Sequence, residues 1–266
     1  MAEKGINRYI NLWKNIENAG EYIFKKNERH TRSLRFTTKP IPINFDVPES
    51  LYQVFKEIFM EDVYSIENLI KKLPANPVIV DIGANAGFFD ILLLSKIPSA
   101  TILAYEPLTS NTAFVDKVIV ENAFMKQHVS LHQAAVTGTE KESIDLYMED
   151  TEDNQVVASV FEGFNKDNLK KTTVPCFSLT KIVKDNNLSK IDLLKMDCEG
   201  SEYDIIYNTA PEIVQLASHI AIEVHDVDDK TYNFTSLKKY LESLGYSITS
   251  TPINNFCYAV DAIRKT

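Results

Sequence analysis

Residues 77–107 read PVIVDIGANAGFFDILLLSKIPSATILAYEP, and this stretch decides the fold of the chain. An apolar run at 78–80 ends in Asp81, a small-residue loop follows at 83–87, and a helical pattern leads to a second apolar run that ends in Glu106. Continuous apolar runs of this kind are typical of parallel strands that helices cover on both faces. The stretch therefore predicts a βαβ unit.

The loop and the acid at the end of the second run predict a nucleotide site. Gly83 and Gly87 let the backbone turn tightly and approach a ligand, and the loop's free N–H groups at the start of the next helix favour a carboxylate or phosphate. Glu106 follows Gly87 by 19 residues and is placed to accept hydrogen bonds from the two ribose hydroxyls. Together these features predict an adenosine-containing ligand.

The spacing of the loop favours S-adenosylmethionine among such ligands. The loop reads D-x-G-x-N-x-G, so Asn85 stands where the dinucleotide fingerprint G-x-G-x-x-G has its middle glycine. A polar side chain there suits a ligand that ends in an amino acid better than one with a pyrophosphate. Two alternatives stay open: an NAD-dependent Rossmann oxidoreductase, which would use Glu106 in the same way, and a catalytically inactive module that binds a cofactor and a partner.

Four segments, taken in order, resemble the motifs of the FkbM family of S-adenosylmethionine-dependent methyltransferases. They are VIVDIGANAGFF at 78–89, AYEPLTSN at 104–111, QAAV at 133–136 and IDLLKMDCEGSEYDII at 191–206. The resemblance implies a Rossmann-like class I methyltransferase fold and S-adenosylmethionine as methyl donor, with S-adenosylhomocysteine as product. It also implies methylation of a hydroxyl on a small molecule or sugar.

Strand and helix patterns alternate through a domain at 75–266, which predicts an α/β fold with a mostly parallel, seven-stranded sheet and helices on both faces. An antiparallel hairpin at 246–250 and 255–262 is expected to close the sheet. Short extended pieces at 142–178, which include SIDLYME, VVASVFEG and TTVPCFS, interrupt the alternation near the substrate side.

Residues 1–74 form an appendage before this domain. Apolar residues at 5–25 recur with a period close to that of a helix, which predicts one amphipathic helix. An extended, Pro-punctuated segment is expected at 31–47, and short helices at 49–60 and 63–72. The amphipathic helix needs an apolar surface to pack against, and it could join two copies of the chain in a homo-oligomer.

The expected cofactor contacts come from the ends of the strands and from the resemblance, which places Gln133 and Ala134 beside the adenine. For Asp81 the alternative is a structural cap of the loop, and for the QAAV run it is the end of a buried strand. The full set is Asp81, Gly83, Ala84, Asn85, Gly87, Glu106, Pro107, Gln133, Ala134 and Asp197.

Lys195, Glu199 and His225 are the expected catalytic residues. Alternation along the strand puts Lys195, Asp197 and Glu199 on one face, toward the crevice where α/β sheets bind ligands. Glu223 and His225 end the next strand, and a histidine with an unperturbed pKa of about 6.5 is a credible general base. Because Lys195 lies within an apolar strand, a structural ion pair with an acid is its main alternative role.

No metal site is predicted. Asp197, Glu199, Glu223 and His225 could converge on a divalent cation, but the sequence has no compact ligand motif. The three cysteines are widely spaced and form no C-x-x-C pair, so they suggest neither a disulfide framework nor a zinc site.

The net charge of −9 and the pI near 5.1 argue against nucleic acid as a partner. A basic stretch at 25–39 is expected to be solvated surface, with a mouth that attracts an anionic substrate as the alternative. The N-terminus lacks the apolar core of a signal peptide, and no run approaches the length of a membrane span. A cytoplasmic protein without a membrane partner is therefore expected.

Overall fold

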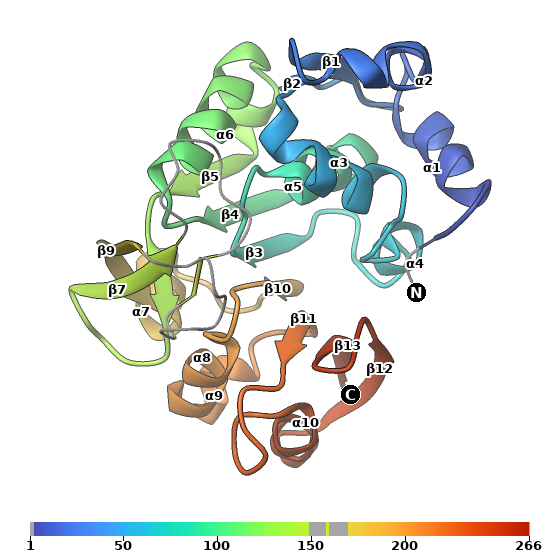
Figure 1. The fold of residues 1–266 in the computed structure, drawn as a ribbon. Coiled ribbons are helices and arrows are strands. Elements are labelled where there is room, and N and C mark those ends of the chain that lie inside the picture. Colours follow the sequence, from blue (N-terminus) through green and yellow to red (C-terminus); the bar gives the residue numbers. More distant parts are fainter. Residues whose placement is uncertain (1–2, 149–157, 160–169, 266) are drawn as a thin grey trace.

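The computed structural model describes residues 3–148, 158–159 and 170–265, and a seven-stranded sheet forms its centre (Figure 1). In sheet order the strands are β5 (Val129–His132), β4 (Thr101–Tyr105), β3 (Val78–Ile82), β10 (Leu193–Met196), β11 (His219–His225), β13 (Cys257–Arg264) and β12 (Tyr246–Pro252). Neighbouring strands are parallel except where β13 runs antiparallel to both β11 and β12. The predicted α/β class, the mostly parallel sheet and the closing hairpin are confirmed.

Helices cover both faces of this sheet. Successive residues of a strand point to opposite faces, and in the central strands both sets include apolar residues that pack against helices. Ile79 joins one apolar cluster with α5 (Phe88–Lys96) and α6 (Thr109–Glu121), whereas Val80 joins the cluster on the other face. That second face is covered by α7 (Leu179–Asp185), α8 (Glu202–Asn208), α9 (Pro211–Val214) and α10 (Phe234–Ser243). Within the described residues, none of the helices is both long and apolar enough to cross a bilayer.

The appendage folds into short elements and lacks the single helix expected at 5–25. Its elements are α1 (Asn7–Asn15), α2 (Gly20–Lys25), β1 (Leu34–Thr37), β2 (Asn44–Val47), α3 (Tyr52–Phe59) and α4 (Ile66–Ile70). The first helix ends because Ile16 becomes extended, is fully buried and pairs with Thr38 in an isolated β-bridge. A tertiary contact thus overrides the helical period of the sequence.

Aromatic side chains pack the appendage against α5. Phe36 and Phe45 of the β1–β2 hairpin contact Phe55 of α3, and Phe45 also stacks on Phe59 with ring centroids 5.3 Å apart. Phe88, the first residue of α5, lies 5.6 Å from the Phe45 ring and 5.9 Å from the Phe59 ring. The appendage and the sheet domain therefore share one continuous apolar core on this face.

The interruption between β5 and β10 forms a second, smaller sheet. Its strands, in sheet order, are β6 (Ala135–Thr137), β9 (Lys170–Ser178), β7 (Ser143–Met148) and β8 (Ala158–Ser159). The extended pieces expected from SIDLYME and TTVPCFS correspond to β7 and β9. Of the VVASVFEG stretch only residues 158–159 belong to the described residues, and the rest lies outside them.

Gly83 brings the loop after β3 against the end of β10. Its φ of 78° lies in the left-handed region, and a Cβ built on it would stand 1.9 Å from the carbonyl oxygen of Asp197. The space that the glycine provides is therefore filled by the backbone of the neighbouring strand end. Gly245 has a similar φ of 92°, but a Cβ there would meet nothing within 4 Å.

We expect Gly83→Ala to destabilise the protein far more than Gly245→Ala. Both variants put an L side chain at positive φ, which costs about 1–2 kcal/mol, but only the first also forces two backbone segments apart, which adds about 1–3 kcal/mol or more. Urea unfolding of the two variants measures the difference. Equal losses of unfolding free energy would contradict the close approach of the two loops.

Candidate active site

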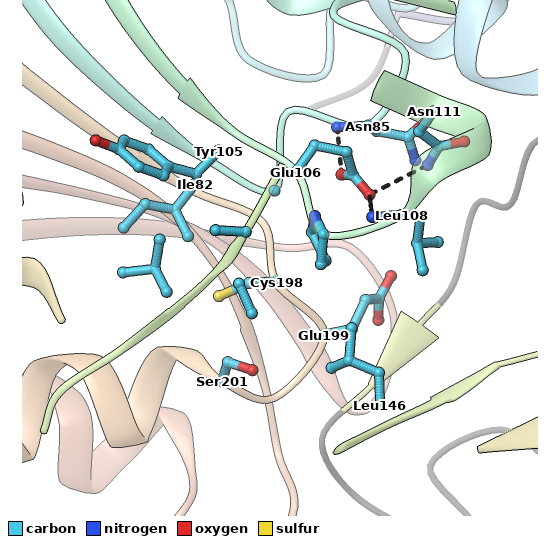
Figure 2. A pocket seen from close by; sticks show the side chains of 15 residues that line it. Ile82, Asn85, Tyr105, Glu106, Leu108, Asn111, Leu146, Cys198, Glu199 and Ser201 are labelled. Carbon is cyan, nitrogen blue, oxygen red and sulfur yellow. Dashed lines mark hydrogen bonds between the residues drawn. The ribbon is translucent and has the colours of Figure 1, made fainter. Parts of the chain in front are cut away.

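Glu106, directly after β4, holds together the loops that follow two neighbouring strands. Its Oε2 accepts the backbone N–H of Asn85, in the loop between β3 and α5, at 2.8 Å. Its Oε1 accepts the backbone N–H of Leu108 at 3.0 Å and the side-chain amide of Asn111 at 3.4 Å (Figure 2). One carboxylate thus joins the two loops at the carboxyl ends of β3 and β4.

The charge of Glu106 changes near neutral pH. Its burial raises the pKa of the carboxyl to about 7, although the hydrogen bonds from Leu108 and Asn85 oppose the shift. An ionised carboxylate accepts hydrogen bonds with both oxygens, whereas the protonated group must donate one of its own. The capacity of this group to hold hydroxyls of a ligand therefore depends on pH.

The N–H groups of the loop at 83–87 all donate to acceptors within the protein, which corrects the expectation that they are free to bind an anion. The acceptors lie at the end of β4 and within the loop itself, so the backbone N–H groups are satisfied without a ligand. The pairs are Gly83 and Ala84 with the Tyr105 carbonyl, Asn85 with Glu106, Ala86 with the side chain of Asn85, and Gly87 with the Ala84 carbonyl. The loop forms a rigid wall of the site.

A pocket lies between this loop, Glu106 and the segment after β10 (Figure 2). The residues that line it are Ile82, Gly83, Asn85, Tyr105, Glu106, Pro107, Leu108, Asn111, Ala134, Ala135, Val136, Leu146, Cys198, Glu199 and Ser201. The lining includes these expected cofactor contacts: Gly83, Asn85, Glu106, Pro107 and Ala134. In the described part of the chain, the remaining expected contacts lie outside the lining: Asp81, Ala84, Gly87, Gln133 and Asp197.

Three of these remaining residues make contacts within the loops and helices beside the pocket. Gly87 has a φ of 66° at the start of α5, and a Cβ there would stand 3.1 Å from Val115. Ala84 is buried in the loop. Gln133 is exposed, and its side-chain amide donates to Thr109 Oγ1 at 2.7 Å. They shape the loops around the pocket without facing it.

Some residues of the pocket wall were not singled out from the sequence. Asn111 ends the AYEPLTSN run and lies in the first turn of α6, close to Glu106 in the sequence, so this motif could have identified it as a pocket residue. Leu146 comes from β7 of the small sheet. No local pattern predicts that this strand reaches the strand ends, because its placement depends on long-range pairing.

Lys195 forms a buried ion pair with Asp81. Its Nζ lies 3.0 Å from Asp81 Oδ1 and donates to the carbonyl oxygen of Gly83 at 2.7 Å. Although burial lowers it, the negative charge of Asp81 holds the pKa of Lys195 above its ordinary value. The structural ion pair considered for Lys195 is therefore present, and neither side chain belongs to the pocket lining in the described part of the chain.

Asp90 of α5 adds a second carboxyl to this pair. Burial, and then the charge of Asp81, raise the pKa of Asp90 well above its usual range, which favours the neutral form of this carboxyl. The buried charges of Asp81 and Lys195 then balance one to one. Such balance is what makes buried ions tolerable in a low-dielectric core.

Asp197, directly after β10, binds a side chain of the appendage. Its Oδ2 accepts the hydroxyl of Tyr64 at 2.6 Å, and the Tyr64 ring packs edge-on against Phe89 at 5.1 Å. Burial, and then the charge of Glu223, raise the pKa of Asp197 to about 6. The appendage thus contributes a polar group to the ends of the strands.

Glu199 is the expected catalytic residue that lines the pocket. Its backbone has a φ of 49°, in the left-handed region, and its carbonyl oxygen accepts the hydroxyl of Ser159 at 2.6 Å. Burial, and then the charge of Asp197, raise the pKa of the Glu199 carboxyl to about 8. A strained residue with a perturbed pKa in a crevice is typical of a functional position.

His225 ends β11, and its ring lies close to the carboxyl groups of three glutamates. Its Nε2 is 3.4 Å from Glu199 and 3.5 Å from Glu223, and its Nδ1 is 3.4 Å from Glu202. Burial lowers the pKa of His225, but hydrogen bonds with Cys257 and two of these glutamates outweigh burial and raise it well above its ordinary value. The imidazole is therefore charged near neutral pH, which argues against the expected role of general base.

Comparison with known proteins gives matches over most of the chain. The family pattern described as Methyltransferase FkbM domain matches residues 81–248, which is more than half of the chain. "Methyltransferase sdnD" of Sordaria araneosa is 27% identical over 223 residues, which cover 74% of this chain and 82% of that protein. "Methyltransferase 1" of Beauveria bassiana is 26% identical over 215 residues, 73% of this chain and 80% of that protein. The crystal structure of methyltransferase FkbM from Methylobacillus flagellatus KT superposes with a TM-score of 0.47 at 12% identity, covering 80% of this chain and 60% of that one.

We expect Lys195→Met to destabilise the protein by about 3–5 kcal/mol, because Asp81 would remain buried without its counter-charge. Adding Asp81→Asn should restore at least half of the loss, since the double variant buries no uncompensated ion. Urea unfolding of the wild type, both single variants and the double variant gives the coupling free energy. Additive losses in the double variant would show that the two side chains do not form a stabilising pair.

Proposed function

Because the chain belongs to the FkbM methyltransferase family, we propose that it transfers the methyl group of S-adenosylmethionine to a hydroxyl oxygen of a small molecule or sugar. The observation that carries the proposal is the buried carboxylate of Glu106 at the tip of β4, on the wall of the pocket. A carboxylate at the end of the second strand of a Rossmann-like sheet is the group that binds ribose hydroxyls.

The residues present fit an adenosine ligand. Glu106 Oε2 accepts one backbone N–H and has a further lone pair for a ribose hydroxyl, whereas Oε1 already accepts the Leu108 N–H and, at 3.4 Å, the Asn111 side-chain amide. Apolar side chains that suit a flat adenine also line the pocket: Leu108, Ala134, Ala135, Val136 and Leu146. When bound, the cofactor supplies a methyl group on a positively charged sulfur.

The chain itself must orient the acceptor and take up its proton. Attack on a methyl carbon requires nucleophile and leaving group to be collinear, which a rigid site provides. A neutral alcohol is a weak nucleophile, so proton acceptance by a nearby base accelerates the transfer. We assign this role to Glu199, because its carboxylate lines the pocket and its backbone is held in place by Ser159.

His225 supports Glu199 in this proposal. It ends β11, the strand next to β10, and its Nε2 lies 3.4 Å from the Glu199 carboxylate. A positive charge there orients the carboxylate and lowers its pKa, against the burial that raises it. An amine acceptor would need less help from a base, and for this reason the carboxylate favours a hydroxyl acceptor.

We expect the affinity for S-adenosylhomocysteine to fall about tenfold between pH 8 and pH 6, because the Glu106 carboxyl, with a pKa of about 7, accepts ribose hydrogen bonds best when ionised. The pKa of this acid is raised, so the favourable ionised form exists above pH 7 and is lost as the pH falls. Glu106→Ala should weaken binding more than tenfold at pH 8. Isothermal titration calorimetry measures both effects.

Two controls accompany this measurement. Glu106→Gln should remove most of the pH dependence, and Glu212→Ala, which changes an exposed acid at the start of α9, should keep the wild-type profile. Unchanged affinity in Glu106→Ala would remove the ribose assignment. Thermal stabilisation by NAD but not by S-adenosylhomocysteine would overturn the cofactor itself.

We expect Glu199→Gln to lower kcat for methyl transfer by about 10²- to 10⁴-fold, the usual contribution of a general base. The affinity for S-adenosylhomocysteine should change by less than about threefold, because the acceptor side of the site is altered. Single-turnover rates with an alcohol acceptor measure the effect. A wild-type rate in this variant would exclude Glu199 as the base.

A further inference from the structure

Three different ligand atoms converge at the ends of β11 and β13. They are a carboxylate oxygen of Glu223, a ring nitrogen of His225 and the sulfur of Cys257, which all lie within 4.8 Å of one another. Glu223 Oε1 is 3.1 Å from the Cys257 sulfur and 3.5 Å from the His225 nitrogen. A carboxylate, an imidazole and a thiol thus meet at one point beside the pocket.

The sheet itself fixes this arrangement. His225 and Cys257 are direct partners in the antiparallel ladder of β11 and β13, and Glu223 precedes His225 by two residues and so lies on the same face. Cys257 is 3% exposed, and His225 is largely buried. Ligands on neighbouring strands of a central ladder are held more rigidly than ligands on loops.

The other nitrogen of the imidazole has a carboxylate of its own. Glu202 is fully buried, its Oε2 accepts the N–H of Gly200 at 2.7 Å, and its Oε1 accepts the backbone N–H of His225 at 2.9 Å. The same Oε1 lies 3.4 Å from His225 Nδ1. A carboxylate behind Nδ1 orients Nε2 toward a ligand position, and this arrangement is typical of histidines that bind metal ions.

We propose that Glu223, His225 and Cys257 bind a divalent transition-metal ion of the zinc type. Zinc takes thiolate, imidazole and carboxylate ligands at about 2.0–2.3 Å in tetrahedral geometry, so its ligand atoms lie about 3.3–3.7 Å from one another. The observed separations of 3.1 Å and 3.5 Å are close to these values. Mg²⁺ and Ca²⁺ fit poorly, because a thiolate is a soft ligand and these ions prefer oxygen.

The surroundings favour a cation at this point. Glu199, Glu202 and Glu223 each have a carboxyl oxygen within 3.5 Å of a His225 ring nitrogen, so oxygen ligands crowd around a single imidazole. The positive charge of Lys195 contributes to lowering the pKa of Glu223, but Lys195 is itself paired with Asp81. A bound divalent ion would replace the proton on Nε2 and balance the cluster.

Three protein ligands leave one tetrahedral position for water or substrate, as in catalytic zinc sites. Glu199 lines the pocket and lies 3.4 Å from the same Nε2, so the site borders the acceptor region of the pocket. A role of the ion in polarising an acceptor oxygen at that position rests on the proposed methyl transfer. The binding of the metal ion is independent of that function.

The test is a titration of the chelator-treated full chain with Co²⁺ alone, followed by absorption. We expect one ion per chain, intense tetrahedral d–d bands and a sulfur-to-cobalt charge-transfer band in the near ultraviolet, and loss of all bands on addition of Zn²⁺. Absence of saturable binding, or binding without the sulfur band, would overturn the proposal. Neither result depends on methyl transfer.

Matched variants identify the ligands. Cys257→Ser should abolish the sulfur band, whereas Cys176→Ser, which changes another thiol that is 3% exposed but lies in β9, should keep it. Glu223→Gln and Glu202→Gln should each weaken Co²⁺ binding about 10- to 100-fold, and they serve as the test if Cys257→Ser does not fold by circular dichroism. A sulfur band that persists in Cys257→Ser, or wild-type affinity in Glu223→Gln, would contradict the site.

Discussion

The buried pair of Lys195 and Asp81 sets the arrangement of the strand ends. β3 and β10 are neighbours in the middle of the sheet, and their register places these two residues side by side. Because the same ammonium also binds the carbonyl oxygen of Gly83, one charge fixes the ends of both strands and the first turn of the loop. The loop then presents its Asn85 N–H to Glu106. The pocket wall therefore depends on a charge pair that does not face the pocket.

Local patterns in the sequence predicted the βαβ unit, the parallel sheet, its closing hairpin and the position of Glu106 at a strand tip. These features depend on residues close together in the chain, where apolar runs and turn residues act directly. The predictions that failed concern features that depend on tertiary contacts. The first helix ends at Ile16 because of a bridge to Thr38, and the loop N–H groups are used by carbonyls of β4 and by Glu106. The charge of His225 and its contact with Cys257 follow from strand register, which spacing alone does not reveal.

Segments outside the recognisable motifs complete the site. The appendage contributes Tyr64 to Asp197, and the small sheet contributes Ser159 to Glu199 and Leu146 to the pocket wall. The central sheet thus supplies most of the groups expected to bind the cofactor, while two peripheral segments contact residues at the ends of its strands. Differences in acceptor among proteins that share this fold can arise from such peripheral segments without any change at the strand tips.

The order of the last two strands bears on how the protein is made. β12 precedes β13 in the chain, yet β13 lies between β12 and β11, so β12 has no partner in the sheet until β13 has been synthesised (Figure 1). The edge of β11 therefore stays open until β13 has added to the sheet, and an open strand edge can pair with another chain. Cys257 also arrives only with β13. Addition of β13 thus closes the edge of β11 and brings Cys257 opposite His225 in the same step.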